Sequence, residues 1–202
     1  IQCLSGCGRV MEKYLYLTEL SWVEPWVNGG VVPLKCASSY KSIERHGIFT
    51  PDENLIDTST HDINQFASAI SIENSSVTFF GGEINGIKLP SVMKIDRKTE
   101  DGLVLCLANR RSNYIAKRLG KKACVKIFNI YELKDMLDEQ IGVCSLMDKC
   151  EYTKTHLRNH FLKSELDSWQ EEYRIFWPGV EAAEVKIKRD MAMQIPIRGS
   201  GY

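Results

Sequence analysis

The sequence predicts an α+β protein with a mixed, mostly antiparallel sheet and a few flanking helices. Segments rich in β-branched and aromatic residues outnumber segments with helical periodicity, and the two kinds do not alternate regularly. Regular alternation would indicate a doubly wound nucleotide-binding fold, and neither a G-x-G-x-x-G nor a Walker sequence is present. The 202 residues are expected to form a single domain, 1–202, whose end, 191–202, is a flexible tail.

The composition is that of a globular protein. Hydrophobic residues make up 44% of the chain and charged residues 26%, which excludes disorder as a description of the whole chain. Lys+Arg and Asp+Glu number 26 each, so a globally basic nucleic-acid binder is not indicated. No apolar run approaches the ~20 residues of a membrane-spanning helix, so no membrane partner is expected. The 7 cysteines contain no C-x-x-C pair, which favours reduced thiols and a cytoplasmic location.

Strands are expected where apolar, aromatic or β-branched residues cluster between turn signals. In chain order they are 13–20, 30–37, 76–80, 84–89, 102–108, 123–128, 172–177 and 184–188. The turn signals include Asn28-Gly29-Gly30 and Gly81-Gly82. The run 102–108 is continuously apolar, which is typical of a strand buried on both faces.

Helices are expected where apolar residues recur at helical spacing, at 62–70, 109–119 and 129–141. Gly120 is placed to end the second helix, and Asn129 with Glu132 three residues later is placed to begin the third. The polar stretch 38–62 is expected to be a long loop. The stretch 151–168 is compatible with either helix or strand.

A glutamine and two glutamates stand directly before the last long apolar run, in Trp169-Gln170-Glu171-Glu172-Tyr173-Arg174-Ile175. Gln170 and Glu172 are two residues apart at the start of an expected strand, so their side chains are expected to share one face. A carboxylate there can hydrogen-bond a ribose hydroxyl and stabilise positive charge developing at an anomeric carbon. The alternative is a solvated acidic face that leads into an apolar strand.

This stretch resembles the C-terminal E-x-E-[Trp/Tyr]-Arg-Ile signature of a broad bacterial family with links to phage defence, with Gln170 in place of the first glutamate. The resemblance extends to 103–127 and, upstream, to the segments 26–30, 39–45 and 50–54. The Q-x-E pattern is also similar to the motif of ADP-ribosyltransferases, which use its glutamate to activate NAD. The resemblance implies an ADP-ribosyltransferase-like fold, NAD as the substrate and no metal.

The resemblance also implies roles for individual residues. Glu172 would be the catalytic carboxylate and Gln170 would position the acceptor. Tyr40 would stack on nicotinamide, and Arg45 would clamp the pyrophosphate in a bidentate manner. The alternative for Tyr40 is ordinary packing, and for Arg45 an exposed surface position.

An early segment carries a second resemblance. Leu15-Tyr16-Leu17-Thr18 resembles the Leu-Tyr-His-x-Thr start of DNA-modifying ADP-ribosyltransferase toxins, with Tyr16 at the histidine position. The resemblance implies that Tyr16 and Thr18 hold the ribose on the nicotinamide side. The alternative for Tyr16 is packing in the core or at its rim.

A run of basic residues without an intervening acid lies between Gly102 and Tyr131. Its members are Arg110, Arg111, Lys117, Arg118, Lys121, Lys122 and Lys126. With Tyr114 available for stacking, such a surface could track an RNA or DNA backbone or bind the acidic surface of an antitoxin protein. The alternative is a solvated helix face followed by a turn.

These observations predict an NAD-dependent ADP-ribosyltransferase that modifies RNA or DNA, or else a protein. The resemblance implies a role as a bacterial toxin or phage-defence effector. One alternative is a non-catalytic module that binds nucleic acid or a partner. Another is a metal-dependent nuclease using Glu184-Val185-Lys186 and carboxylates of 52–62. His156-x-x-x-His160 has the spacing of a metal-binding pair on a helix, but no glutamate follows His156 in the metalloprotease manner.

Overall fold

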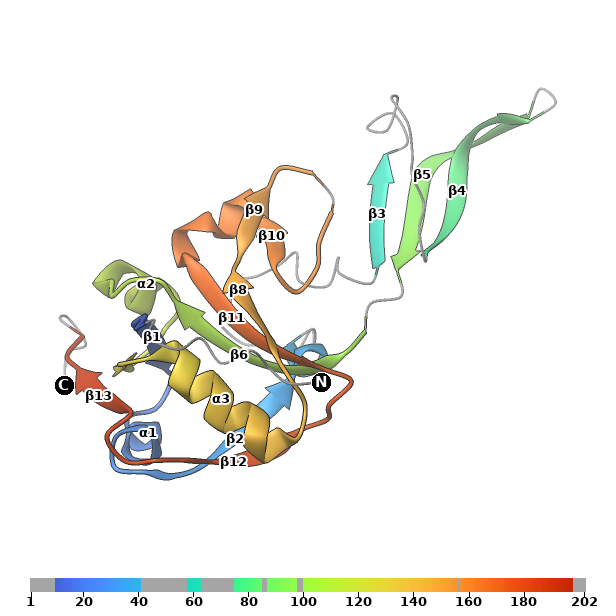
Figure 1. Ribbon diagram of the computed structural model, residues 1–202. Coiled ribbons are helices and arrows are strands. Elements are labelled where there is room, and N and C mark those ends of the chain that lie inside the picture. The colour runs from blue at the N-terminus through green and yellow to red at the C-terminus, as the bar shows by residue number, and fades with distance from the viewer. Residues whose placement is uncertain are drawn as a thin grey trace.

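The fold is described by a computed structural model of the chain. Side chains and backbone are described for residues 10–40, 100–155 and 157–197, and the backbone alone for strands 58–62, 75–84 and 87–97. The predicted α+β class is confirmed, because the described chain contains an antiparallel eight-stranded sheet together with three α-helices (Figure 1). Every pairing within the eight-stranded sheet is antiparallel.

The eight strands of this sheet are β1 (Lys13–Leu17), β2 (Gly30–Cys36), β6 (Gly102–Ala108), β7 (Ala123–Ile127), β8 (Leu146–Lys149), β11 (Glu172–Pro178), β12 (Ala183–Ile187) and β13 (Ala192–Ile195). Six of the eight strands agree closely with segments expected from the sequence, whereas β8 and β13 were not expected. All residues of β6 but one are buried, as its continuous apolar run predicts. The order is β12-β2-β6-β1-β7-β13, and β11 pairs with both β6 and β8.

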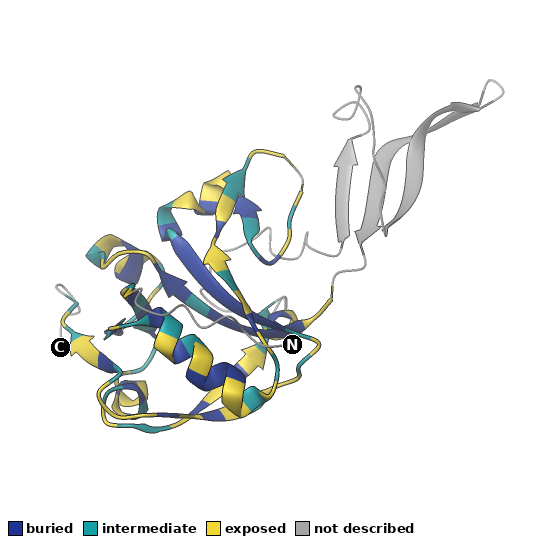
Figure 2. Ribbon diagram, in the orientation of Figure 1, coloured by how far each residue is buried: buried dark blue, intermediate teal, exposed yellow. Residues whose placement is uncertain are grey.

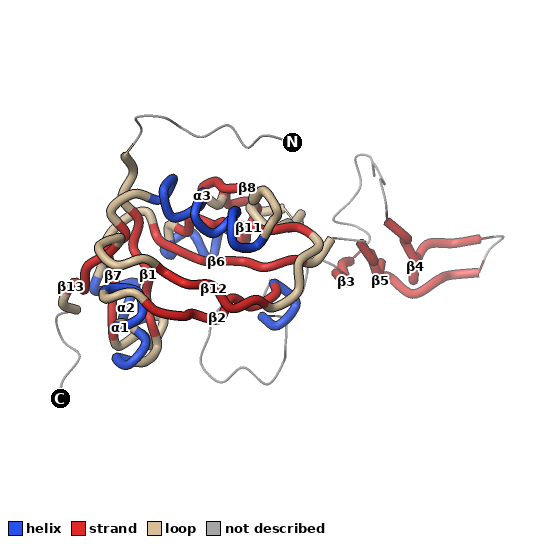
Figure 3. Tube along the Cα trace, turned by 60° about the horizontal axis from the view of Figure 1, so that its bottom comes forward, coloured by secondary structure: helices blue, strands red, loops and turns tan. Residues whose placement is uncertain are grey.

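Strand β6 is the point at which the sheet branches. One edge pairs with β11 along its whole length, from Gly102 opposite Pro178 to Ala108 opposite Glu172. The other edge pairs with β2 near its start and with β1 only at Ala108, which lies opposite Tyr14. The sheet therefore divides into an arm of β2 and β12 and an arm of β1, β7 and β13, which lie at different ends of β6 (Figure 3).

The larger core lies on the face of the sheet that helix α3 (Ile130–Ile141) covers. Alternate residues of β11, among them Ile175 and Trp177, join Leu133 and Leu137 of the helix in this core. The predicted start of α3 is confirmed, since the Asn129 side chain accepts a hydrogen bond from the Tyr131 amide at 3.2 Å. Figure 2 shows the buried stripe of the helix turned toward the sheet.

The opposite face of the sheet carries the other residues of β11. A small apolar cluster of Ala37, Val104 and Phe176 lies there. Because side chains alternate along a strand, Glu172 and Arg174 point to the same face as Phe176. This second face therefore holds Glu172, the carboxylate singled out from the sequence.

Short elements connect the strands of the sheet. They are η1 (Leu20–Trp22), α1 (Glu24–Val27), η2 (Ala37–Tyr40), α2 (Asn113–Arg118), β9 (Glu151–Thr153), β10 (Leu162–Ser164) and η5 (Glu165–Gln170). Helix α2 begins later than expected because Ser112, whose hydroxyl accepts from the Ile115 amide at 3.3 Å, caps it. The ambiguous stretch 151–168 contains both kinds of structure, and β9 and β10 form a parallel pair within it.

The prediction of a long loop over 38–62 is wrong at both ends of that range. Its start belongs to η2, and its end forms strand β3 (Thr58–Asp62). Strand β3 belongs to a separate three-stranded antiparallel sheet with β4 (Ser75–Ile84) and β5 (Ile87–Arg97). Asp62 therefore ends a strand, and the rest of the helix expected at 62–70 lies outside the described residues.

The turn expected at Gly81-Gly82 is also wrong. Strand β4 continues through both glycines, and its pairing register shifts between Phe80 and Gly82. Glycine inside a strand commonly marks such an irregularity, so the two glycines indicate a shift in pairing register and not a turn.

The prediction of a flexible tail over 191–202 is wrong for the first part of that range. Strand β13 pairs with β7 over four residues, from Ala192 opposite Ile127 to Ile195 opposite Cys124. Ala192 is buried in the larger core. Residues after 197 lie outside the described part of the chain.

Cysteine chemistry departs from expectation at one position. Cys36, Cys106, Cys124 and Cys150 are free thiols, as predicted, whereas Cys144 is disulfide-bonded. The expectation that all thiols are reduced is therefore wrong. None of the helices in the described residues has the length and apolar character needed to cross a membrane.

Candidate functional site

A buried group of polar side chains lies on the second face of the sheet, where β10, η5 and β11 meet. We call it the Glu172 cluster, and its members are Lys163, Asp167, Gln170, Glu172 and Arg174. Each of the five is less than 10% exposed. Burying charges is unfavourable unless they are paired, so the hydrogen bonds among these side chains have to compensate for lost hydration.

Glu172 is the centre of the cluster. Its Oε1 accepts a hydrogen bond from Arg174 Nε at 2.7 Å. Its Oε2 accepts from Lys163 Nζ at 2.7 Å and from Arg174 Nη2 at 3.2 Å. The carboxylate is thus held between two cations, one from the same strand and one from β10.

Gln170 joins the cluster through Lys163, whose Nζ also donates to Gln170 Oε1 at 2.8 Å. Gln170 Nε2 in turn donates to Asp167 Oδ1 at 3.2 Å. The expectation that Gln170 and Glu172 share one face of a strand is wrong, because Gln170 ends η5 and Glu171 has a left-handed φ of 45°. The two side chains meet because a lysine binds both.

The pKa of Glu172 reflects this environment. Burial by itself would raise the pKa, but the charges and hydrogen bonds of Arg174 and Lys163 outweigh burial and hold the pKa of Glu172 well below its usual range. The carboxylate is therefore ionised at neutral pH.

This shift predicts acid sensitivity. A carboxyl group whose pKa is lower in the folded protein stabilises it above the unfolded pKa of about 4.3 and loses that contribution as pH falls toward the folded pKa. We expect the urea midpoint to decrease between about pH 5 and pH 3. The double variant Lys163→Met/Glu172→Gln should show a smaller decrease over the same range. Equal decreases in the two proteins would show that other carboxylates cause the acid sensitivity.

Backbone contacts anchor the cluster to its surroundings. The Glu172 amide donates to the Tyr152 hydroxyl at 2.9 Å, and Arg174 Nη1 donates to the His160 carbonyl at 2.9 Å. The His160 ring stacks on Phe176, with ring centroids 3.8 Å apart. His160 thus lies in a turn beside the sheet and not on a helix, and His156 lies outside the described residues. Within the described part of the chain, no three His, Cys, Asp or Glu side chains gather as a metal site.

Tyr16 lies on the same sheet face as Glu172. Tyr14 and Glu172 both lie opposite Ala108, from either edge of β6, and Tyr16 follows Tyr14 on that face. The Tyr16 hydroxyl accepts from the Ser112 amide at 2.6 Å, and burial raises its pKa to about 12. Its hydroxyl is therefore a neutral donor that ties β1 to the start of α2.

The other residues assigned to NAD lie in different places. Thr18 Oγ1 accepts from Lys121 Nζ at 2.9 Å. Tyr40 ends η2 and packs against the small cluster of Ala37, Val104 and Phe176. Arg45 lies outside the described residues.

Most of the basic run is engaged in contacts. Glu171 pairs with Arg110 at 2.6 Å, and Glu19 pairs with Lys122 at 2.8 Å. Glu12 pairs with Lys126. Among the described residues, no carboxylate pairs with Arg111, Lys117 or Arg118, so the positive charge that remains is centred on α2.

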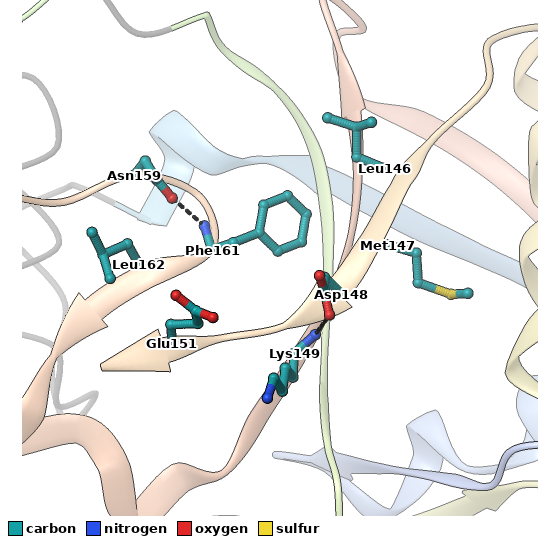
Figure 4. Close-up of a pocket in the computed structure, with 8 residues that line it drawn as sticks. All are labelled: Leu146, Met147, Asp148, Lys149, Glu151, Asn159, Phe161 and Leu162. Atoms are coloured by element: carbon teal, nitrogen blue, oxygen red, sulfur yellow. Dashed lines mark hydrogen bonds between the residues drawn. The ribbon is translucent and has the colours of Figure 1, made fainter. Parts of the chain in front are cut away.

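A pocket of about 450 Å³ lies away from these residues, between β8 and the segment that carries β9 and β10 (Figure 4). Its lining is Leu146, Met147, Asp148, Lys149, Glu151, Asn159, Phe161 and Leu162. None of the side chains assigned to NAD or nucleic acid from the sequence contributes to it.

Sequence reasoning missed Lys163, Asp167 and Arg174. A signal for Arg174 was present, since a basic and an acidic residue two apart in a buried apolar strand share a face and must neutralise each other. No comparable signal existed for Lys163, which approaches through an irregular segment.

The chain was compared with protein-family models, with curated proteins and with solved structures. No family model, curated protein or solved structure matches the chain.

Proposed function

We propose that the protein is an NAD-dependent ADP-ribosyltransferase with an ADP-ribosyltransferase-like fold, in which Glu172 is the catalytic carboxylate. The observation that supports this most is the position of the Glu172 carboxylate at the start of β11, where Lys163 and Arg174 donate hydrogen bonds to it and hold it in one orientation. An anion fixed in a water-poor site stabilises developing positive charge more strongly than the same anion in water.

In the proposed reaction the bond between ribose C1′ and the nicotinamide nitrogen breaks, and its electron pair leaves with neutral nicotinamide. The acceptor atom then bonds to C1′ and releases its proton to solvent. Within the described residues Glu172 Oε1 accepts a single hydrogen bond, and a carboxylate oxygen can accept two. Oε1 can therefore take a ribose hydroxyl while Arg174 and Lys163 keep the carboxylate in position.

Further residues fit this proposal. Tyr16 is a neutral hydroxyl group on the same sheet face, and the edge of β6 between Val104 and Ala108 pairs with neither β1 nor β2. An NAD-sized ligand would use that unpaired edge, with Tyr40 near its β2 end. The biological role as a toxin or defence effector, with an antitoxin as a partner, belongs to the same proposal.

A second candidate is a non-catalytic binding module. It is favoured by the burial of Glu172, whose side chain is only 8% exposed and accepts hydrogen bonds at both oxygens. In that case the Glu172 cluster serves to attach β10 and η5 to the sheet. For the nuclease alternative, Glu184 and Lys186 are exposed on β12, and the side chains of 52–62 lie outside the described residues.

The test is to incubate the protein with labelled NAD and RNA, DNA or cell lysate, with and without chelator. We expect label transfer that chelator does not affect and that Glu172→Gln reduces about 10²- to 10³-fold. Glu171→Gln is the matched control, because it makes the same chemical change one residue earlier at an exposed carboxylate, and it should retain transfer.

Loss of folding is separated from loss of chemistry by the double variant Lys163→Met/Glu172→Gln, which removes one charge of each sign. If this variant melts near the unmodified protein and still transfers label, Glu172 is not catalytic. If NAD neither raises the melting temperature nor is cleaved in any condition, the enzymatic proposal is wrong; nucleic acid that then stays intact without chelator favours the binding module over the nuclease.

A further inference from the structure

Aromatic and basic side chains of helix α2 contact Trp169 of η5 beside the Glu172 cluster. We call this group of side chains the α2–η5 surface, and its members are Tyr114, Lys117, Arg118 and Trp169. The Arg118 guanidinium lies over the Trp169 ring at 4.1 Å and donates to the Tyr114 hydroxyl at 2.7 Å. The two rings meet edge to face with centroids 6.1 Å apart.

The charge of this surface is not balanced. Seven basic residues form the run that the sequence places together, but Arg110, Lys122 and Lys126 already pair with glutamates. Lys117 and Arg118 on α2 pair with no carboxylate among the described residues. The polyanion-binding potential of the run is thus concentrated on one short helix.

The aromatic side chains favour a particular ligand. Tyr114 is 58% exposed, which is unusual for so large a ring, while Trp169 is half-buried and has Arg118 on its face. Trp169 and Tyr114 hold Arg118 in one place, so little side-chain entropy is lost when the guanidinium binds a phosphate. Tyr114 offers a ring on which an unpaired base can stack.

We infer that the α2–η5 surface binds single-stranded nucleic acid, with a base on Tyr114 and phosphates on Lys117 and Arg118. A base inside a duplex has no free face to stack, so a single strand fits better than a double strand. The ligand chemistry is shared by RNA and DNA.

The surface is joined to the proposed catalytic group at two points. Trp169 directly precedes Gln170, and Arg110, which lies between β6 and α2, pairs with Glu171. A strand bound here therefore lies next to Glu172. The claim that this surface holds the acceptor rests on the proposed function. The claim that it binds single-stranded nucleic acid does not.

The test is fluorescence anisotropy with labelled oligonucleotides of equal length: single-stranded DNA, single-stranded RNA and duplex DNA. We expect both single strands to bind more tightly than the duplex. Comparing the Kd for single-stranded DNA with that for single-stranded RNA shows whether the ribose 2′-hydroxyl contributes to binding. Tyr114→Ala should weaken binding about tenfold, whereas Tyr114→Phe, which keeps the ring and loses only the hydroxyl that accepts from Arg118, should weaken binding much less.

Salt dependence tests the cations. For Lys117→Gln/Arg118→Gln, the slope of log Kd against log salt should decrease by about 0.7 for each phosphate that the variant no longer neutralises. Lys122→Gln is the matched control, since that lysine already pairs with Glu19, and its slope should be unchanged. Equal binding by the Tyr114→Ala, Lys117→Gln/Arg118→Gln and unmodified proteins overturns the inference.

The outcomes also separate the two proposals. If the protein transfers ADP-ribose only to proteins and binds no oligonucleotide at about 50 mM salt, this inference is wrong and the proposed function stands. If single strands bind as described but NAD is never cleaved, the surface is correctly assigned and the enzymatic proposal fails.

Discussion

Replacing Glu172 by leucine is expected to destabilise the protein by about 3–5 kcal/mol. The substitution leaves Lys163 and Arg174 buried beside each other without the carboxylate that both bind. Removal of one partner from a buried ion pair is costly because the remaining charge has lost its hydration without compensation. The measurement is urea unfolding at neutral pH, followed by a probe that reports tertiary structure.

The control removes all three charges together. In Lys163→Met/Glu172→Leu/Arg174→Leu no ion of the triad is left unpaired, and buried triads of this kind can be replaced by apolar residues at little cost. We expect the triple variant to regain most of the stability lost by Glu172→Leu. A triple variant that is less stable than the single variant would show that the hydrogen bonds of the cluster, beyond its charge balance, stabilise the fold.

Replacing Gly102 by alanine is expected to cost about 3 kcal/mol, at the upper end of the effects of overpacking. A Cβ atom at this position would lie 2.1 Å from the Trp177 carbonyl oxygen and 2.9 Å from its carbonyl carbon. Both atoms belong to the backbone of β11, so relief requires the two central strands to separate. The free energy of unfolding from urea titration measures the effect.

Gly120→Ala serves as the comparison for this substitution. Gly120 has a left-handed φ of 64°, but no heavy atom lies within 4 Å of the added Cβ. Its cost should therefore be only the backbone contribution of about 1–2 kcal/mol. If Gly102→Ala costs no more than Gly120→Ala, the close approach of β6 and β11 is not as tight as described.

Most side-chain contacts on the second face of the sheet could not be inferred from the sequence. Lys163 and Glu172 are nine positions apart, and the contact between them depends on η5 and on the left-handed conformation of Glu171. Likewise Glu19 and Glu171 neutralise Lys122 and Arg110 across more than sixty residues. A count of basic residues in sequence therefore overstated the charge of the surface.

The sequence by itself determined the strands β6 and β11 and the helix α3, since apolar runs, helical spacing and the Asn129 cap act within a few residues. It also indicated Glu172 as a residue of interest. Only the tertiary structure decided what surrounds that carboxylate, because strand order and the path of 151–170 bring Lys163 and Arg174 to it. Local preferences depend on neighbours in the chain, whereas the ionisation of a buried group depends on neighbours in space.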